Sequence, residues 1–335
     1  MRIFVYLLLL LFPIILSLPA CKETALPKEE VDEEEGSDLL RKLNGMIAND
    51  ATNAQLRYNR ARILEENGQY PKAIEDMRVA IIADSMNAVY YHFLSDLFMD
   101  SNNSSKSLLT MQKAAQLFPD STLTQLKLSE TYFILKQYNE SIFQLNDIIR
   151  RQPNNAEAYL MLGLNFRGMG DISRAINAFQ TATEKDPNIV DAWIILGDLF
   201  AEKEEPIAKR YYETAVNVAP QNITALHSKA YYLQNHNDID GALDLYRQIN
   251  IIEPKYPDAY LNAGILLIEK DSLDTALEQF NILAKMAPTN AKGYYFKAYI
   301  LNELGQKEAA RKEAQNAVNF DSNYKDAIEL LEKLK

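Results

Sequence analysis

The sequence predicts an all-α protein, a solenoid of about eight stacked helical hairpins, and three series of residues carry this prediction. Small residues recur every 34 positions, once 33, from Ala61 to Ala298. A second series, all Ala or Ser, follows the first by 12 or 11 positions, from Ala73 to Ala310. A third series, mostly proline, follows the second by 12 positions. Three independent series with one period indicate a repeat array.

Each unit is expected to contain two helices of about 12–14 residues, since hydrophobic spacings of three and four place residues on one helical face. The small residues let the two helices approach closely. Bulky apolar residues four positions beyond the second series fill the space around them: Met77, Met111, Leu145, Phe179, Tyr212, Tyr246 and Phe280. Residues that tolerate a left-handed helix end lie between the helices: Gly68, Asn102, Gly170, Asn237, Asp271 and Gly305. The closing prolines lack an N–H group and stop the second helix.

Residues 156–189 are the clearest copy, "AEAYLMLGLNFRGMGDISRAINAFQTATEKDPNI". The copy carries Leu162, Gly163, Phe166, Gly170, Ala175, Phe179, Ala182 and Pro187 at its marked positions. This pattern resembles the tetratricopeptide repeat, which implies a right-handed α-solenoid. Eight units follow: 54–87, 88–121, 122–155, 156–189, 190–222, 223–256, 257–290 and 291–324. The fifth lacks one residue between Gly197 and Ala208, which we place in the turn around "EKEEP" and expect to tilt the next unit.

An open stack needs solvating caps at its ends. Residues 37–53 are predicted to form half a repeat that begins at Ser37, with Leu39, Leu43 and Met46 on its packing face. Residues 325–335 are predicted to form a C-terminal capping helix. Its apolar face would comprise Ala327, Leu330, Leu331 and Leu334.

Residues 1–20 have the features of a bacterial secretion signal: Arg2, an apolar run of about 15 residues and then small residues. The run is short for a membrane span. The sequence Leu18-Pro19-Ala20-Cys21 resembles a lipobox, which implies removal of residues 1–20 and lipid attachment at Cys21. An uncleaved anchor and an incidental cysteine are the alternatives. Residues 21–36 are rich in acids and are predicted to form a flexible tether.

Composition excludes several classes of function. The net charge of −11 argues against nucleic-acid binding, which needs a basic face. Acylation of Cys21, the one cysteine, leaves no thiol for catalysis, disulfides or zinc. His92 and His227 lie four units apart and His236 has no ligand-like spacing, so no metal site is expected. No nucleophile elbow, Walker or dinucleotide motif occurs, and we expect neither cofactor nor enzyme activity.

In the tetratricopeptide family, positions 2, 5, 9 and 12 of each unit line a concave groove. Carried onto this sequence, the resemblance implies a partner-binding groove of His92, Asp96, Met99, Leu126, Glu130, Phe133, Leu160, Leu164, Leu261, Ile265, Tyr295 and Tyr299. The alternative is that the apolar members pack between neighbouring helices. As a groove, they would suit protein or peptide segments with apolar anchors and some positive charge.

The resemblance therefore implies a non-enzymatic scaffold, anchored by lipid in the bacterial cell envelope. The family's carboxylate clamp is absent, because Tyr58 and Arg62 stand where it requires Lys and Asn. A ligand- or glycan-binding accessory lipoprotein of an outer-membrane uptake system is the alternative, although Trp193 occupies a packing position. Lys22 after the cysteine favours the outer membrane. The acidic run behind it resembles surface-export tags and leaves the periplasmic face or the cell surface open.

Overall fold

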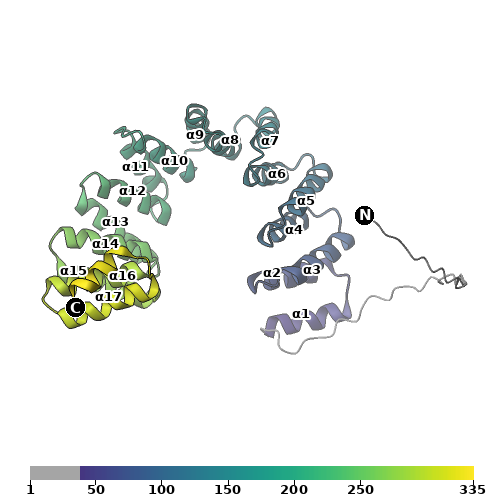
Figure 1. Cartoon of the computed structure of the whole chain (residues 1–335). Helices are drawn as coiled ribbons and strands as arrows, with labels where there is room; N and C mark the ends of the chain where they lie inside the picture. The colour runs from purple at the N-terminus through teal and green to yellow at the C-terminus, as the bar shows by residue number, and fades with distance from the viewer. Residues whose placement is uncertain (1–37) are drawn as a thin grey trace, which may run out of the picture.

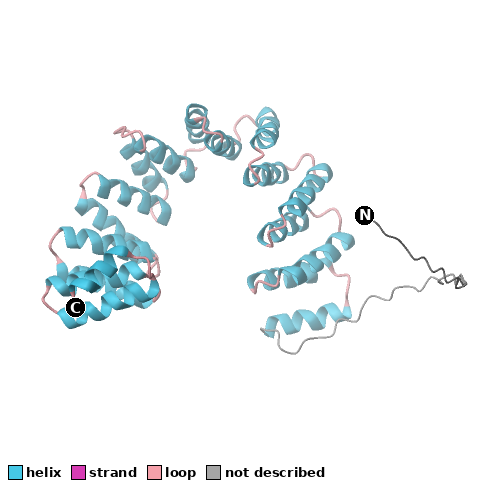
Figure 2. Ribbon diagram, in the orientation of Figure 1, coloured by secondary structure: helices cyan, strands magenta, loops and turns pink. Residues whose placement is uncertain are grey.

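The computed structural model describes residues 38–335, and every element in this part of the chain is a helix. The helices stack in pairs along an arc, with α1 near one end and α17 near the other (Figure 1). Loops join them, and the ribbon shows the same two-helix unit throughout (Figure 2). The predicted all-α solenoid is confirmed.

The first helices of the eight hairpins are α2 Ala54–Glu66, α4 Ala88–Asp100, α6 Thr122–Ile134, α8 Ala156–Gly168, α10 Val190–Ala201, α12 Ile223–Asn235, α14 Pro257–Glu269 and α16 Ala291–Glu303. Their partners are α3 Tyr70–Ala83, α5 Ser104–Leu117, α7 Tyr138–Arg151, α9 Ile172–Lys185, α11 Ala208–Val218, α13 Ile239–Ile252, α15 Leu273–Met286 and α17 Lys307–Phe320. The flanking helices are α1 Asp38–Asn49 and α18 Lys325–Lys333.

Side-chain caps and left-handed turns define the hairpins. Six first helices begin after a residue whose side chain accepts a backbone N–H bond, namely Asn53, Asn87, Ser121, Asn155, Asn222 and Asn290. Each hairpin then turns at a residue with positive φ, always the fifteenth of its unit: Gly68, Asn102, Lys136, Gly170, Glu204, Asn237, Asp271 and Gly305. The six predicted turn residues are confirmed. Lys136 and Glu204 were not foreseen, because neither residue type favours this conformation.

The two helices of a hairpin approach closely where the first and second series of small residues meet. A Cβ atom added to Gly163 would lie 2.5 Å from the Phe179 ring, and one on Gly264 would lie 2.5 Å from the Phe280 ring. Both rings are fully buried. The glycines therefore make room for the aromatic residues four positions beyond the second series, as the spacing predicted.

Serine replaces alanine or glycine in the second unit without leaving a polar group unsatisfied. The Oγ atoms of Ser95 and Ser107 lie 2.8 Å apart in a hydrogen bond between α4 and α5. Ser141 Oγ donates to the Ser129 carbonyl in the third unit, at 2.8 Å. Buried hydroxyl groups are tolerated here because each has a partner.

The core is a series of apolar clusters along the arc rather than one centre. One surrounds Tyr246 between α11 and α14, another surrounds Phe179 between α8 and α10, and a third surrounds Phe280 between α14 and α16. Each cluster draws on neighbouring units, as expected for a repeat array in which a unit contacts chiefly its neighbours.

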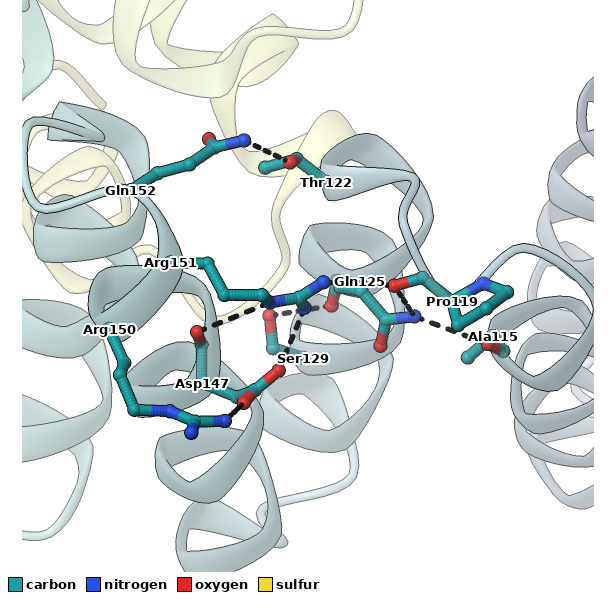
Figure 3. Close-up of polar contacts among 9 residues, drawn as sticks. All are labelled: Ala115, Pro119, Thr122, Gln125, Ser129, Asp147, Arg150, Arg151 and Gln152. Carbon is teal, nitrogen blue, oxygen red and sulfur yellow. Dashed lines mark hydrogen bonds and ion pairs between the residues drawn. The ribbon is translucent and has the colours of Figure 1, made fainter.

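Polar contacts near the loops tie the third unit to the second and also join the third unit's own two helices (Figure 3). Arg151 donates from Nη1 to the Pro119 carbonyl at 3.0 Å, and Gln152 Nε2 donates to Thr122 Oγ1 at 2.8 Å. Asp147 pairs with both Arg150 and Arg151 on the surface of α7. The end of α7 is thereby fixed against the α5–α6 loop.

The fifth unit differs from the others in its second helix. Glu204 keeps the left-handed turn at position fifteen, so the missing residue falls between Glu204 and Ala208. The helix α11 begins at Ala208, whereas the equivalent Ala175 is the fourth residue of α9. Pro206 disfavours the helical conformation at Glu205, the residue that corresponds to the first residue of α9.

The predicted packing face of the N-terminal half-repeat was right at Leu43 and wrong at Leu39 and Met46. Leu40, Leu43 and Ile47 are the buried residues of α1, whereas Leu39 and Met46 are exposed. The spacing of three and four also fits the observed set, and contact with α2 selects it. Ser37 lies outside the described residues.

A buried ionic cluster joins α1, α2 and α3. The Asp76 carboxylate, 1% exposed, pairs with Arg57 and Arg60 at 2.7 Å each. Arg60 also donates to Asn44 Oδ1 on α1, at 2.9 Å.

At the C-terminal end of the array, Ala327 of α18 is buried, and the predicted apolar residues Leu330, Leu331 and Leu334 are half-buried.

A candidate interaction face on the first helices

The first helix of each hairpin lies on the inner side of the arc and its partner on the outer side, most clearly from α4 to α11 (Figure 1). Neighbouring first helices also touch one another, as α4 does α6 and α6 does α8. The side of a first helix that faces neither its partner nor its neighbours therefore faces the concave side. We call the exposed and half-exposed side chains on this side of α4, α6, α8 and α10 the concave face.

The structure distributes the predicted groove residues over three environments. His92 and Leu160 are each 6% exposed and lie inside the array. Asp96 and Glu130 are exposed. The remainder are half-buried: Met99, Leu126, Phe133, Leu164, Leu261, Ile265, Tyr295 and Tyr299.

Several of the half-buried residues pack against core clusters. Leu126, Phe133 and Leu164 contact the cluster around Leu145, and Leu261, Ile265 and Tyr299 contact the cluster around Phe280. The alternative left open by the sequence, packing between helices, therefore describes part of what they do. Their role in binding stays a prediction.

Three exposed apolar residues at positions 2 and 9 of the first helices were missing from the predicted groove. Val89 and Leu123, 49% and 59% exposed, occupy position 2 of adjacent units. Tyr231, 53% exposed, occupies position 9 of the sixth unit. The resemblance to the tetratricopeptide family implies that positions 2 and 9 are groove positions, but the predicted set did not include these three residues.

The concave face is acidic. Helices α4, α6, α8 and α10 carry six acids, Asp96, Asp100, Glu130, Glu157, Asp191 and Asp198, against Lys127 and Arg167. Lys127 pairs with Asp96 at 3.2 Å, and Arg167 pairs with Glu202 at 3.6 Å. Both cations are thus engaged.

Glu130, Glu157 and Asp191 have no ion-pair partner within residues 38–335. They belong to three successive first helices, α6, α8 and α10. Burial raises the pKa of Glu157, and repulsion from Asp191 and Glu130 raises it further. Glu157 therefore lies within electrostatic reach of Asp191 on α10 and Glu130 on α6.

His92 is buried where α4 packs against α6 and is not on an open surface. Its Nε2 atom is 3.0 Å from Thr124 Oγ1 on α6. The Thr124 hydroxyl donates to Ser121 Oγ, so Nε2 of His92 carries a proton and donates to Thr124. Burial and the nearby Lys127 lower the pKa of His92, and Asp96 acts in the opposite direction.

His227 occupies the equivalent position in the sixth unit. It contacts the rings of Tyr246 and Tyr256, and its Nε2 atom lies 3.4 Å from Asn262 Nδ2. Burial lowers its pKa as well. Across the described chain no three His, Cys, Asp or Glu residues are grouped closely enough to hold a metal ion.

Trp193 is turned into the array. Its Nε1 atom donates to the Pro187 carbonyl at 2.9 Å, and its ring packs near Tyr211. The indole is therefore not a free platform for a sugar ring.

The lipid-attachment prediction at Cys21 and the tether at 21–36 lie outside the described residues. Between residues 38 and 335, no helix has the length and apolar character needed to cross a membrane.

Two sequence models described as "Tetratricopeptide repeat" match the chain, one at residues 160–206 and 261–324 and the other at 44–75. Over 283 residues the chain is 25% identical to Superkiller protein 3 of Schizosaccharomyces pombe, covering 79% of this chain and 20% of that protein. It is 31% identical to the peroxisomal targeting signal receptor of Pichia angusta, covering 46% of this chain and 27% of the receptor. The chain thus spans less than a third of either relative's length.

A solved structure supports the fold. The C-terminal part of a repeat-containing protein from Cytophaga hutchinsonii superposes with a TM-score of 0.56 at 17% identity, covering 72% of this chain and 99% of that one. At this level of identity the likeness concerns architecture alone.

Proposed function

Tetratricopeptide-repeat models match parts of this chain, and from this similarity we propose that it is a non-enzymatic interaction scaffold held on a membrane of the bacterial cell envelope by lipid on Cys21. Proteins with these repeats act in protein–protein interaction. The observation that carries the proposal is the concave face, where Val89 and Leu123 expose apolar surface on adjacent first helices. Such surface suits an extended or helical segment of another protein.

The membrane part of the proposal rests on the sequence before residue 38. A lipidated Cys21 would place the array at a membrane surface, and the acidic tether at 21–36 would let it reach a partner there. Two or three acyl chains anchor a protein stably, at about 0.8 kcal/mol per buried methylene, whereas one is marginal. The outer membrane is the proposed location, with the repeats on its periplasmic face or on the cell surface.

Replacement of the cysteine tests the anchor. Cys21→Ser should abolish labelling by a radioactive fatty acid and move the protein from the membrane fraction to the soluble fraction. A variant that loses the label but stays fully in the membrane fraction would support an uncleaved anchor instead.

Paired substitutions by glutamate test the concave face. Val89→Glu with Leu123→Glu should remove proteins that co-purify with the wild type from its native host. The matched control is Leu109→Glu with Phe143→Glu, because these residues are 64% and 71% exposed on the adjacent second helices α5 and α7. Loss of partners only in the control pair would move the binding surface to the convex side.

A further inference from the structure

The concave face combines apolar and anionic side chains in a fixed order. Position 2 of four successive units holds Val89, Leu123, Glu157 and Asp191. Val89 and Leu123 are large exposed hydrophobic residues, and Glu157 and Asp191 are exposed acids. Glu130 is exposed at position 9 of α6, between the two groups. Position 2 therefore changes from apolar to acidic along the array, while α4 also carries the exposed acids Asp96 and Asp100.

The anionic part lacks a counter-charge within the described chain. Asp191 and Glu130 flank Glu157 closely enough that their charges raise its pKa, so negative charge is concentrated around Glu157. The two cations of these first helices are engaged with Asp96 and Glu202. A ligand that brings positive charge to the three acids would offset this negative charge.

The outer side of the same units has the opposite charge. On α5, Leu109 is exposed between Lys106 and Lys113, and the helix carries no acid. Both sides expose apolar residues, and on α7 the exposed Phe143 lies near Glu140 and Asp147. The two sides differ in their balance of charge: α5, α7, α9 and α11 together carry eight Lys or Arg and four acids, whereas α4, α6, α8 and α10 carry two Lys or Arg and six acids. Charge complementarity distinguishes the partners that the two sides would select.

We propose that the concave face of α4 to α10 binds a cationic amphipathic segment, with apolar residues against Val89 and Leu123 and Lys or Arg against Glu130, Glu157 and Asp191. This inference rests on the proposed scaffold function and names the chemistry of its partner. Anionic partners are disfavoured by the same three carboxylates.

Synthetic peptides test the chemistry directly. The probes are three fluorescein-labelled 14-residue peptides that alternate Lys with Leu, Glu with Leu, and Lys with Ser. Anisotropy is measured with the full chain in non-ionic detergent, and empty micelles are the blank. The Lys/Leu peptide should bind at least tenfold more tightly than either other peptide, and its affinity should fall as salt is raised.

Charge-neutral variants locate the binding. The triple variant Glu130→Gln, Glu157→Gln and Asp191→Asn should weaken Lys/Leu binding at least tenfold. The matched control Glu184→Gln, Glu278→Gln and Glu308→Gln makes the same change in net charge at exposed sites on α9, α15 and α17, and should change affinity less than twofold. An equal loss in both triples would overturn the inference, because net charge alone would then explain binding.

Two further outcomes would contradict the proposal. Concentration-dependent self-association that the first triple variant abolishes would assign the face to a second copy of the chain. If no peptide binds, but a photo-crosslinking amino acid placed at Tyr295 captures native partners, the proposal of a cationic segment on this face is refuted. The proposed scaffold function would then still stand. If the peptides bind as predicted but the double variant Val89→Glu with Leu123→Glu loses no native partner, the result would instead count against the scaffold function.

Discussion

At the residue scale, glycine size decides how closely the helices of a hairpin approach. Gly163→Ala should lower the free energy of unfolding by about 1–3 kcal/mol, because the new methyl group meets a buried Phe179 ring 2.5 Å away. Hydrogen exchange should show the loss of protection in α8 and α9. The control is Gly45→Ala, at an exposed position of α1 where an added Cβ atom would meet nothing within 4 Å. Alanine should stabilise the protein there by about 0.5–1 kcal/mol. Equal effects at both sites would contradict close packing.

A second residue-scale effect is pH dependence from His92. Its pKa is below the ordinary 6.5 in the folded protein, so the unfolded chain takes up a proton first as pH falls. The stability contribution of neutral His92 is therefore complete above about pH 6.5 and is lost as pH falls from there toward the folded-state pKa. The groups that face it, Lys127 and Asp96, shift the folded pKa in opposite directions.

His92→Gln tests this effect, because the Gln amide replaces the Nε2 donor to Thr124 without titrating. The decrease in melting temperature between pH 7.5 and pH 5.5 should be smaller in the variant than in the wild type. Identical decreases would show that protonation of His92 is not linked to folding.

At the scale of elements, the Asp76 cluster ties α1 to the first hairpin. Asp76→Asn should destabilise the protein by about 3–5 kcal/mol, since it removes a buried carboxylate that two guanidinium groups contact. The matched control is Asp147→Asn, which removes a carboxylate with two arginine partners at the surface of α7 and should cost far less, because solvent screens surface ion pairs. Urea denaturation measures both. A larger loss in the control would contradict the role of burial.

The sequence predicted the hairpins well because their signals are local. Small residues at a fixed period, left-handed turn residues and closing prolines each act within one unit. Lys136 and Glu204 were missed as turn residues because the backbone turn between the two helices has a left-handed conformation that neither side chain favours. The α1 packing face was missed because two helical stripes, one residue apart, fit the same spacing, and only contact with α2 decides between them.

At the scale of the whole molecule, the candidate site was harder to predict than the fold. The groove positions of the repeat point to the concave side, but neighbouring helices decide how much of each side chain is covered. His92 and Leu160 are buried for this reason, whereas Val89 and Leu123 remain exposed. The acidic character needs the stacking of α6, α8 and α10, which brings acids from three units together.

Covalent capture in the native host is the measurement that tests the central claim most directly. A photo-crosslinking amino acid would replace Leu123 on the concave face or Phe143 on the convex side, both exposed and both in the third unit. We predict that Leu123 captures a defined partner, crosslinked through a segment that combines Lys or Arg with apolar residues, and that Phe143 does not. Capture of the same partner from Phe143, with none from Leu123, would contradict the assignment of the concave face as the interaction surface.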